Sequence, residues 1–205
     1  MYSRLIDRLA ERAKIQRASA ADAAVRDLAS FKEDPPKAIL ITDPGVTEKK
    51  QPKALLEHLL AYVRSGGTSI FCCTFSSFIR PSDFNQFSRT KLDLPWEFGD
   101  YHRTTVHLNR SNLRARQILD HRPCVYESYS QKAVFLKKVD PSAAVYLSTE
   151  DSRTESHVFY LEKVDVGQTP VAFTRYGEGW LGYVGDVNTE EGSDEVILQC
   201  VGCRG

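Results

Sequence analysis

Apolar side chains near the start of the chain recur with the period of a helix. Leu5 and Leu9 fall on one side of a helix over residues 3–17, and charged side chains fill the other side. Ser19 is a residue type that caps helix N-termini, and it introduces a second apolar pattern that ends before a pair of prolines. The pattern predicts a helical extension over residues 1–34.

The period changes after the prolines. A β-branched apolar run over residues 37–42, a helical pattern over 53–65 and a second apolar run over 68–73 form a βαβ unit, whose strands run parallel through a right-handed crossover. Pro81 then occupies the first turn of another predicted helix. The remaining pattern predicts strands over residues 103–109, 132–139, 143–149 and 157–164, two strands around a turn at 176–179, and a final helix over 189–202.

These elements predict an α/β fold. We expect a flavodoxin-like three-layer sandwich with a mainly parallel central sheet, antiparallel additions and covering helices. This domain would span residues 35–205, behind the helical extension at 1–34.

Composition narrows the range of partners. Lysine plus arginine equals aspartate plus glutamate at 27 each, so the formal net charge is zero and no global field attracts a polyanion. The first helix is locally basic, which leaves contact with a polyanion open beside packing or self-association. The chain has no apolar run of about 20 residues and an odd number of cysteines, five, so we expect a cytoplasmic protein with reduced thiols and no membrane partner.

The ends of the predicted parallel strands select the candidate site. In open α/β sheets, ligands bind at the carboxyl ends of the strands. Asp43 follows the first strand, Cys72 and Cys73 end the second, and Asp186 follows a late strand. The same edge would carry the polar residues Thr74, Ser76, Asn188 and Glu190.

Each of these candidates has a structural alternative. A thiol at a strand-to-helix turn can have a lowered pKa and act as a nucleophile, and we prefer Cys73 because it is nearer the strand end. Both Cys72 and Cys73 could equally be core residues. Asp43 and Asp186 could bind a cation, guanidinium or amine together, or each could bond the backbone of its own turn.

A second polar cluster surrounds His102. Trp96 and Glu97 precede it in a segment dense in groups that can bind or orient a polar ligand. The alternative is a surface loop anchored by Trp96 and Tyr101.

Two segments carry a resemblance to a known family. "DPPKAILITDPGV", followed by "LLEHLLAYVRSGGTSIFCC", resembles the central βαβ unit of the class I glutamine amidotransferase-like superfamily, in particular its trehalose-utilisation-type branch. "TPVAFTRYGEGWLGYVGDVN" resembles the later hairpin of that branch. The resemblance covers residues 35–191 in outline, and it implies the fold expected above with Cys72 or Cys73 near the nucleophile position.

The chain also departs from that family. "CCTFSS" lacks the glycines that flank the family's nucleophile, and "GDVNTEE" has no histidine where the family has one. The departures favour an atypical enzyme that transfers or hydrolyses an acyl or amide group on a small polar amine, amide or amino-acid-type substrate. Its candidate catalytic residues are Cys73, Cys72, Asp186 and His102.

Two alternatives to this enzyme remain. One is a non-catalytic binding or assembly module on the same fold, which would dimerise through its N-terminal helices. The other is an aminoacyl transferase that uses charged tRNA, which would require salt-dependent RNA binding. None of the three hypotheses needs an organic cofactor or a metal.

Overall fold

A seven-stranded mixed sheet organises the chain. The computed structural model describes residues 2–31, 35–48, 50–111, 126–156, 158 and 160–202. Across the described residues the strand order is β1-β2-β7-β6-β5-β3-β4. The strands are β1 (Ile39–Ile41), β2 (Thr68–Phe71), β3 (Glu97–Leu108), β4 (Ser128–Lys137), β5 (Ala144–Leu147), β6 (Val171–Tyr176) and β7 (Gly179–Val184).

Parallel pairing is confined to one end of the sheet. β2 lies between β1 and β7 and is parallel to both, whereas the other four neighbouring pairs are antiparallel. The expectation of a mainly parallel sheet was therefore wrong. Parallel neighbours need a crossover of a dozen or more residues. Helix α3 (Lys53–Arg64) supplies one between β1 and β2, whereas β6 and β7 are joined by a two-residue turn that makes them antiparallel.

The antiparallel end of the sheet curls back on the parallel end. The Val134 amide in β4 donates to the Gly185 carbonyl just after β7 at 2.9 Å, and the Leu136 amide donates to the Thr169 carbonyl just before β6 at 2.8 Å. The sheet therefore curls into a half-barrel, in which part of the backbone of its last strand, β4, bonds to residues next to the central strands β6 and β7.

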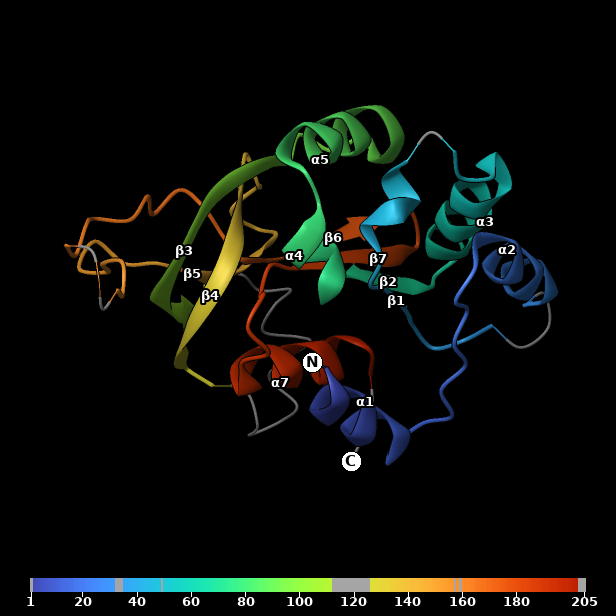
Figure 1. Cartoon of the computed structure of the whole chain (residues 1–205), viewed down its shortest axis with the longest axis horizontal. Coiled ribbons are helices and arrows are strands. Elements are labelled where there is room, and N and C mark those ends of the chain that lie inside the picture. Colours follow the sequence, from blue (N-terminus) through green and yellow to red (C-terminus); the bar gives the residue numbers. More distant parts are fainter. Residues whose placement is uncertain are drawn as a thin grey trace.

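Helices cover both faces of the sheet (Figure 1). On one side α3, α4 (Thr74–Phe78) and α5 (Pro81–Phe87), which continues into the π-helical η2 (Ser88–Leu92), pack over an aromatic core that includes Phe71. The short 3-10 helix η1 (Pro44–Thr47) follows β1, and α2 (Ala21–Ser30) adds Leu28 to this side. On the other side α1 (Ser3–Ala10) and α7 (Glu191–Cys200) lie next to each other.

Several predicted elements differ in extent. The first helix ends at Ala10 instead of near residue 17, and the second begins at Ala21 without a side-chain cap from Ser19. The strand expected over residues 157–164 does not form in its described part, which has one isolated bridge, between Lys163 and Arg153. His157 and Phe159 lie outside the described residues.

The first thirty residues contact the rest of the fold on both sides. α1 packs in the core beneath the sheet, while α2 packs beside α3. The boundary at residues 34 and 35 stays a prediction. Within the described ranges, no helix has the length and apolar character that a membrane crossing requires.

Candidate active site at the ends of the parallel strands

The chain turns sharply at Cys73. β2 ends at Phe71, the Cys72 amide donates to the Ile41 carbonyl at 3.1 Å, and α4 begins at Thr74. Between them Cys73 has φ 63° and ψ −128°. A non-glycine residue rarely adopts positive φ, because its Cβ clashes with the backbone. A strained residue between a strand and a helix is the geometry of a nucleophile elbow.

Hydrogen bonds on both sides hold this elbow in place. The Ser76 hydroxyl donates to the Val184 carbonyl at the end of β7 at 2.7 Å, and the Thr74 hydroxyl donates to the Thr42 carbonyl after β1. The Ser77 amide donates to the Cys73 carbonyl at 3.3 Å. Thr74 and Ser76, which the sequence suggested as substrate-binding residues, thus bond the strand ends.

Both thiols lie inside the protein. Cys72 is 0% exposed and Cys73 is 5% exposed. Their sulfur atoms are 3.6 Å apart and both belong to the core beneath the sheet, because strand alternation stops at Phe71 and no longer places neighbours on opposite faces. The hydrogen bond with Cys73 and burial together raise the pKa of Cys72 well above its ordinary value, so Cys72 stays protonated at neutral pH.

Asp186 organises the loop after β7. Its carboxylate accepts hydrogen bonds from the backbone amides of Asn188 at 2.6 Å and Glu190 at 2.8 Å, next to the start of α7. The side chain is almost fully buried, and burial raises its pKa although the bond with Ser193 acts in the opposite direction. Asp186 therefore has the turn-forming role that the sequence left open.

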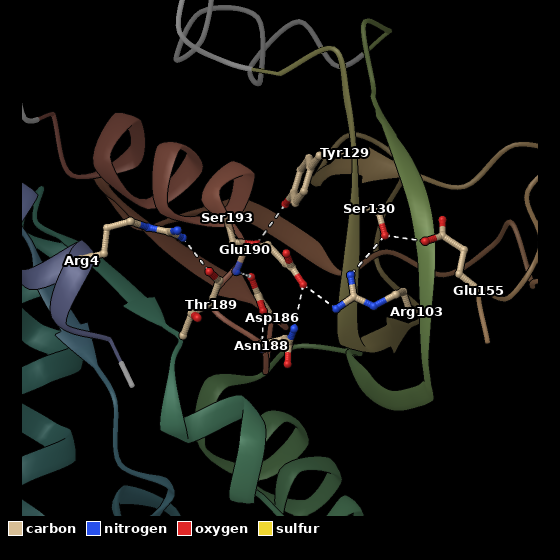
Figure 2. Close-up of polar contacts among 10 residues, drawn as sticks. All are labelled: Arg4, Arg103, Tyr129, Ser130, Glu155, Asp186, Asn188, Thr189, Glu190 and Ser193. Atoms are coloured by element: carbon tan, nitrogen blue, oxygen red, sulfur yellow. Dashed lines mark hydrogen bonds and ion pairs between the residues drawn. The ribbon is translucent and has the colours of Figure 1, made fainter. Parts of the chain in front are cut away.

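Two residues of β4 extend this polar region inward. The Tyr129 hydroxyl lies 3.3 Å from the Ser193 hydroxyl, and its ring packs against Gly192 of α7 (Figure 2). The Gln131 amide lies beside Tyr129 and is fully buried, and among the described residues it has no partner that meets hydrogen-bond geometry. An unpaired buried amide is costly, so this position favours a polar guest.

Tyr2 enters the same region from α1. Its hydroxyl lies 3.3 Å from the Ser77 hydroxyl. Burial raises the pKa of Tyr2 to about 12, and the negative potential of Cys73 and Asp186 adds to this shift, so all three share one environment. We call this set the elbow cluster; it consists of Tyr2, Cys72, Cys73, Ser77, Tyr129, Gln131, Asp186 and Ser193.

A second set of contacts ties the loop after β7 to β3. The Glu190 carboxylate pairs with the Arg103 guanidinium at 2.5 Å and accepts a bond from the Asn188 side chain at 3.0 Å (Figure 2). Arg103 also donates to Ser130 at 3.2 Å, and Ser130 donates to Glu155 at 2.5 Å. Asn188 and Glu190, which the sequence suggested as substrate-binding residues, are therefore bonded to each other, and Glu190 is paired with Arg103.

His102 has a different environment from the one its sequence neighbours suggested. Its ring stacks on Phe135 with centroids 4.4 Å apart, and burial lowers its pKa, so it is neutral near pH 7. Its Nε2 is buried and has no hydrogen-bond partner in the part of the chain that the structure describes. Among the described residues no hydrogen bond joins His102 to either Cys72 or Cys73.

The other predicted site residues do not join the elbow cluster. Asp43 accepts a bond from the Gly45 amide at 2.8 Å, and β2 separates its strand from that of Asp186. Trp96 is buried in the core on the opposite face of the sheet, and Glu97 pairs with Lys138 at 2.6 Å on the surface. In the described ranges, no group of three or more histidine, cysteine or acidic side chains is placed to hold a metal.

Sequence reasoning missed half of the elbow cluster. Tyr2, Tyr129, Gln131 and Ser193 come from three segments far apart in the chain, and none has a motif of its own. The one available signal was the alternation of Tyr129 and Gln131 with Ala133 on one face of a strand, but the predicted strand began at Lys132.

Comparisons with known proteins give weak likenesses. No family model and no curated protein matches the chain. A protein described as ThuA-like from Bacteroides uniformis is a structural neighbour with 11% identity and a TM-score of 0.42, over 90% of this chain and 86% of that one.

Two structures of Gan42B, a GH42 β-galactosidase, are also structural neighbours. The first has 15% identity and a TM-score of 0.37, and it matches 80% of this chain but only 20% of its own length. The second is the E323A catalytic mutant from G. stearothermophilus. It has 14% identity and a TM-score of 0.40, over 92% of this chain and 28% of that one. At such values the likenesses carry no argument about activity.

Proposed function

We propose that this chain is a thiol-dependent enzyme that transfers or hydrolyses an acyl or amide group of a small polar substrate, with Cys73 as its nucleophile. The observation that carries the proposal is the backbone at Cys73, with φ 63° and ψ −128° between β2 and α4. Proteins retain strain of this kind mainly where function requires it, and the elbow presents a side chain at the end of a sheet.

The chemistry requires an acceptor for the thiol proton. The Cys73 thiolate would attack the substrate carbonyl and release an amine or alcohol, leaving an acyl-thioester that water or a second amine resolves. Asp186 is our candidate acceptor because burial raises its pKa, which makes its carboxylate a stronger base than an exposed aspartate. Asp186 would also keep its bonds to the loop backbone.

The inner part of the cluster supports a polar substrate. The Gln131 amide, next to Tyr129, offers both a donor and an acceptor that no atom of the described residues satisfies in hydrogen-bond geometry. These features favour a neutral hydrogen-bonding group at the inner end of the substrate.

A trapping experiment tests the proposal. The chain would be incubated with activated esters and thioesters of small polar acids, and acyl adducts would be located by peptide mass spectrometry. We expect an adduct on Cys73 that disappears in Cys73→Ala and persists in Cys72→Ala. Acylation of neither thiol, in a chain whose Cys73 is shown to be accessible, would reject the enzyme.

One observation favours a second function, a non-catalytic binding or assembly module. Both thiols are buried, and the carboxylates of Asp186 and Glu190 are already bonded within the protein. In a module of this kind Cys72 and Cys73 would react with alkylating reagents only on global unfolding. The alkylation rate as a function of urea therefore separates the two functions.

A further inference from the structure

The first helix and the residue before it contact the elbow cluster and its core. α1 lies next to α7 beneath the sheet (Figure 1) and places Tyr2 against Ser77 of α4. Tyr2 shares the environment of Cys73 and Asp186, the two groups to which the proposed chemistry is assigned. The core that contains the thiol thus includes Leu5 and Leu9 of α1, with Tyr2 packed against it.

Few apolar contacts hold α1 in this position. Leu5 and Leu9 are buried in the core that also contains Cys72 and Cys73. Ile6, which flanks these two leucines on the helix, is half exposed. α1 therefore completes this core with two side chains.

Charge pairs with α7 and its approach supply the other contacts. The Arg4 guanidinium donates to Asp194 at 2.7 Å and to the Thr189 carbonyl at 2.6 Å (Figure 2 draws the second contact). Arg8 pairs with Glu195. All of these are side-chain contacts of α1, so its own backbone forms no hydrogen bond to another described element.

The connection to the rest of the chain is loose. Residues 11–20 form no regular helix or strand and are all exposed. Their backbone hydrogen bonds close the end of α1 or start α2, and between these points the segment makes none to the described part of the chain. A helix on such a connection can detach from the core without disturbing the sheet.

We propose that α1 is a removable cover of the Cys73 site, seated by Leu5, Leu9 and the arginine pairs with α7. In the covered state the Tyr2 ring occupies the approach to the thiol, and in the open state the thiol and Gln131 become accessible. The proposal rests on the proposed function only for what Cys73 does once it is exposed.

The test is the alkylation rate of Cys73 with iodoacetamide at pH 8, resolved by peptide mass spectrometry. We expect the double variant Arg4→Ala/Arg8→Ala to raise this rate at least tenfold. The matched control is Arg12→Ala/Lys14→Ala, which removes the same charge from exposed positions of the same segment and should change the rate less than twofold. Circular dichroism and the urea midpoint verify that both variants remain folded.

Two further measurements keep the test decisive if the double variant unfolds. In the unmodified chain, raising NaCl from about 0.05 M to 1 M should speed alkylation of Cys73 severalfold, because salt screens the partly exposed Arg4 pair while the reagent is neutral. Amides of α1 should exchange hydrogen faster than those of β2 and β7. Salt-independent alkylation together with equal exchange protection would overturn the cover.

Failure of the cover and failure of the enzyme give different results. If α1 release exposes Cys73 but no ester acylates it, the cover stands and the enzyme is rejected. If esters acylate Cys73 at the same rate in Arg4→Ala/Arg8→Ala and in the control variant, the enzyme stands and the cover is rejected.

Discussion

Helices α1 and α3 cover opposite faces of the same sheet, but the fold holds them by different means. α3 buries Leu59, Leu60 and Val63, and the backbone after it bonds the β6–β7 hairpin, with the Trp180 amide donating to the Gly67 carbonyl at 3.0 Å. α1 buries two leucines and is otherwise held by side chains.

The difference shows which helix belongs to the folding unit. Backbone bonds and tight contacts between α3 and the hairpin cannot open without unpacking the sheet. Fully exposed ion pairs contribute about 0–1 kcal/mol each. The Arg4 side chain is 50% exposed, whereas the Arg8–Glu195 pair is largely buried, so the two leucines and these two pairs together hold α1. We therefore expect α3 to unfold with the protein and α1 to detach before it.

The largest expected effect lies at the junction of α3 with the hairpin. A Cβ at Gly179 would stand 2.1 Å from the carbonyl oxygens of both Val63 and Gly67. Gly179→Ala should therefore lower the free energy of unfolding by about 3 kcal/mol or more, because backbone cannot yield as a side chain does. Urea denaturation measures this change.

The control for this junction is Gly167→Ala. A Cβ there meets only the Asp165 side chain, at 3.2 Å. We expect a change within about 0.5 kcal/mol. Equal effects at the two glycines would mean that the α3 junction is less rigid than its geometry indicates.

Two matched leucines test the comparison directly. Leu59 in α3 is 3% exposed and Leu5 in α1 is 2% exposed. Leu59→Ala should cost about 3 kcal/mol, as buried leucine truncations do, whereas Leu5→Ala should cost about 1 kcal/mol, because detachment of α1 caps the loss. Urea midpoints measure both variants.

The alkylation rate of Cys73 also distinguishes the Leu5 and Leu59 variants. Leu5→Ala should speed alkylation of Cys73 under native conditions, and Leu59→Ala should not. Equal losses of stability with equal alkylation rates would show that α1 and α3 belong to one cooperative unit.

A smaller effect concerns the strain beneath α1. Because Cys73 has positive φ, Cys73→Gly should leave the protein about 1 kcal/mol more stable than Cys73→Ala. At Cys72, which lacks positive φ, the order should reverse, with Ala more stable than Gly. The same order at both positions, measured by urea unfolding, would argue against a strained elbow.

The smallest expected effect is the pH dependence of stability. Burial raises the folded-state pKa of Asp186, so its contribution is fully present below the unfolded value of about 3.9 and is lost as pH rises through the folded pKa. For Asp165, bonds from the Gln168 side chain and the Gly167 amide lower the pKa. Its contribution is present above about pH 3.9 and is lost as pH falls through the folded pKa.

The two aspartates should therefore differ in sign. Relative to Asp186→Asn, the unmodified chain should lose stability as pH rises above about 4. Relative to Asp165→Asn, it should lose stability as pH falls below about 4. Urea unfolding between pH 3 and 7 measures both slopes, and parallel slopes would contradict the environment described for Asp186.

Local signals in the sequence located many of the elements. The apolar runs around α3 predicted the βαβ unit, and the Gly177 turn predicted the β6–β7 hairpin, because both depend on neighbours in the chain. Strand direction elsewhere depends on which strands pair, and the curl of β4 onto β7 depends on contacts that periodicity does not encode. For that reason the expectation of a mainly parallel sheet was wrong.

The candidate site was accessible to sequence reasoning only in part. The position of Cys73 at the end of β2 follows from the strand pattern, but its dihedral angles do not. Tyr2 reaches the site through tertiary packing, so no spacing could indicate it, and the alternation that includes Gln131 indicates a shared strand face but not which site that face lines. The pairing of Glu190 with Arg103 was likewise invisible, because the two residues lie on separate strands and loops of a curled sheet.

The exposed segment at residues 11–20 also determines how a detached α1 would compete with other molecules for its position over the Cys73 site. A flexible ten-residue chain keeps its ends within roughly 20 Å of each other, so a detached α1 stays at a millimolar effective concentration near its seat. Re-covering is then independent of protein concentration. A free peptide with the sequence of α1 would need millimolar amounts to take its place, whereas a substrate must outcompete a helix that never diffuses away.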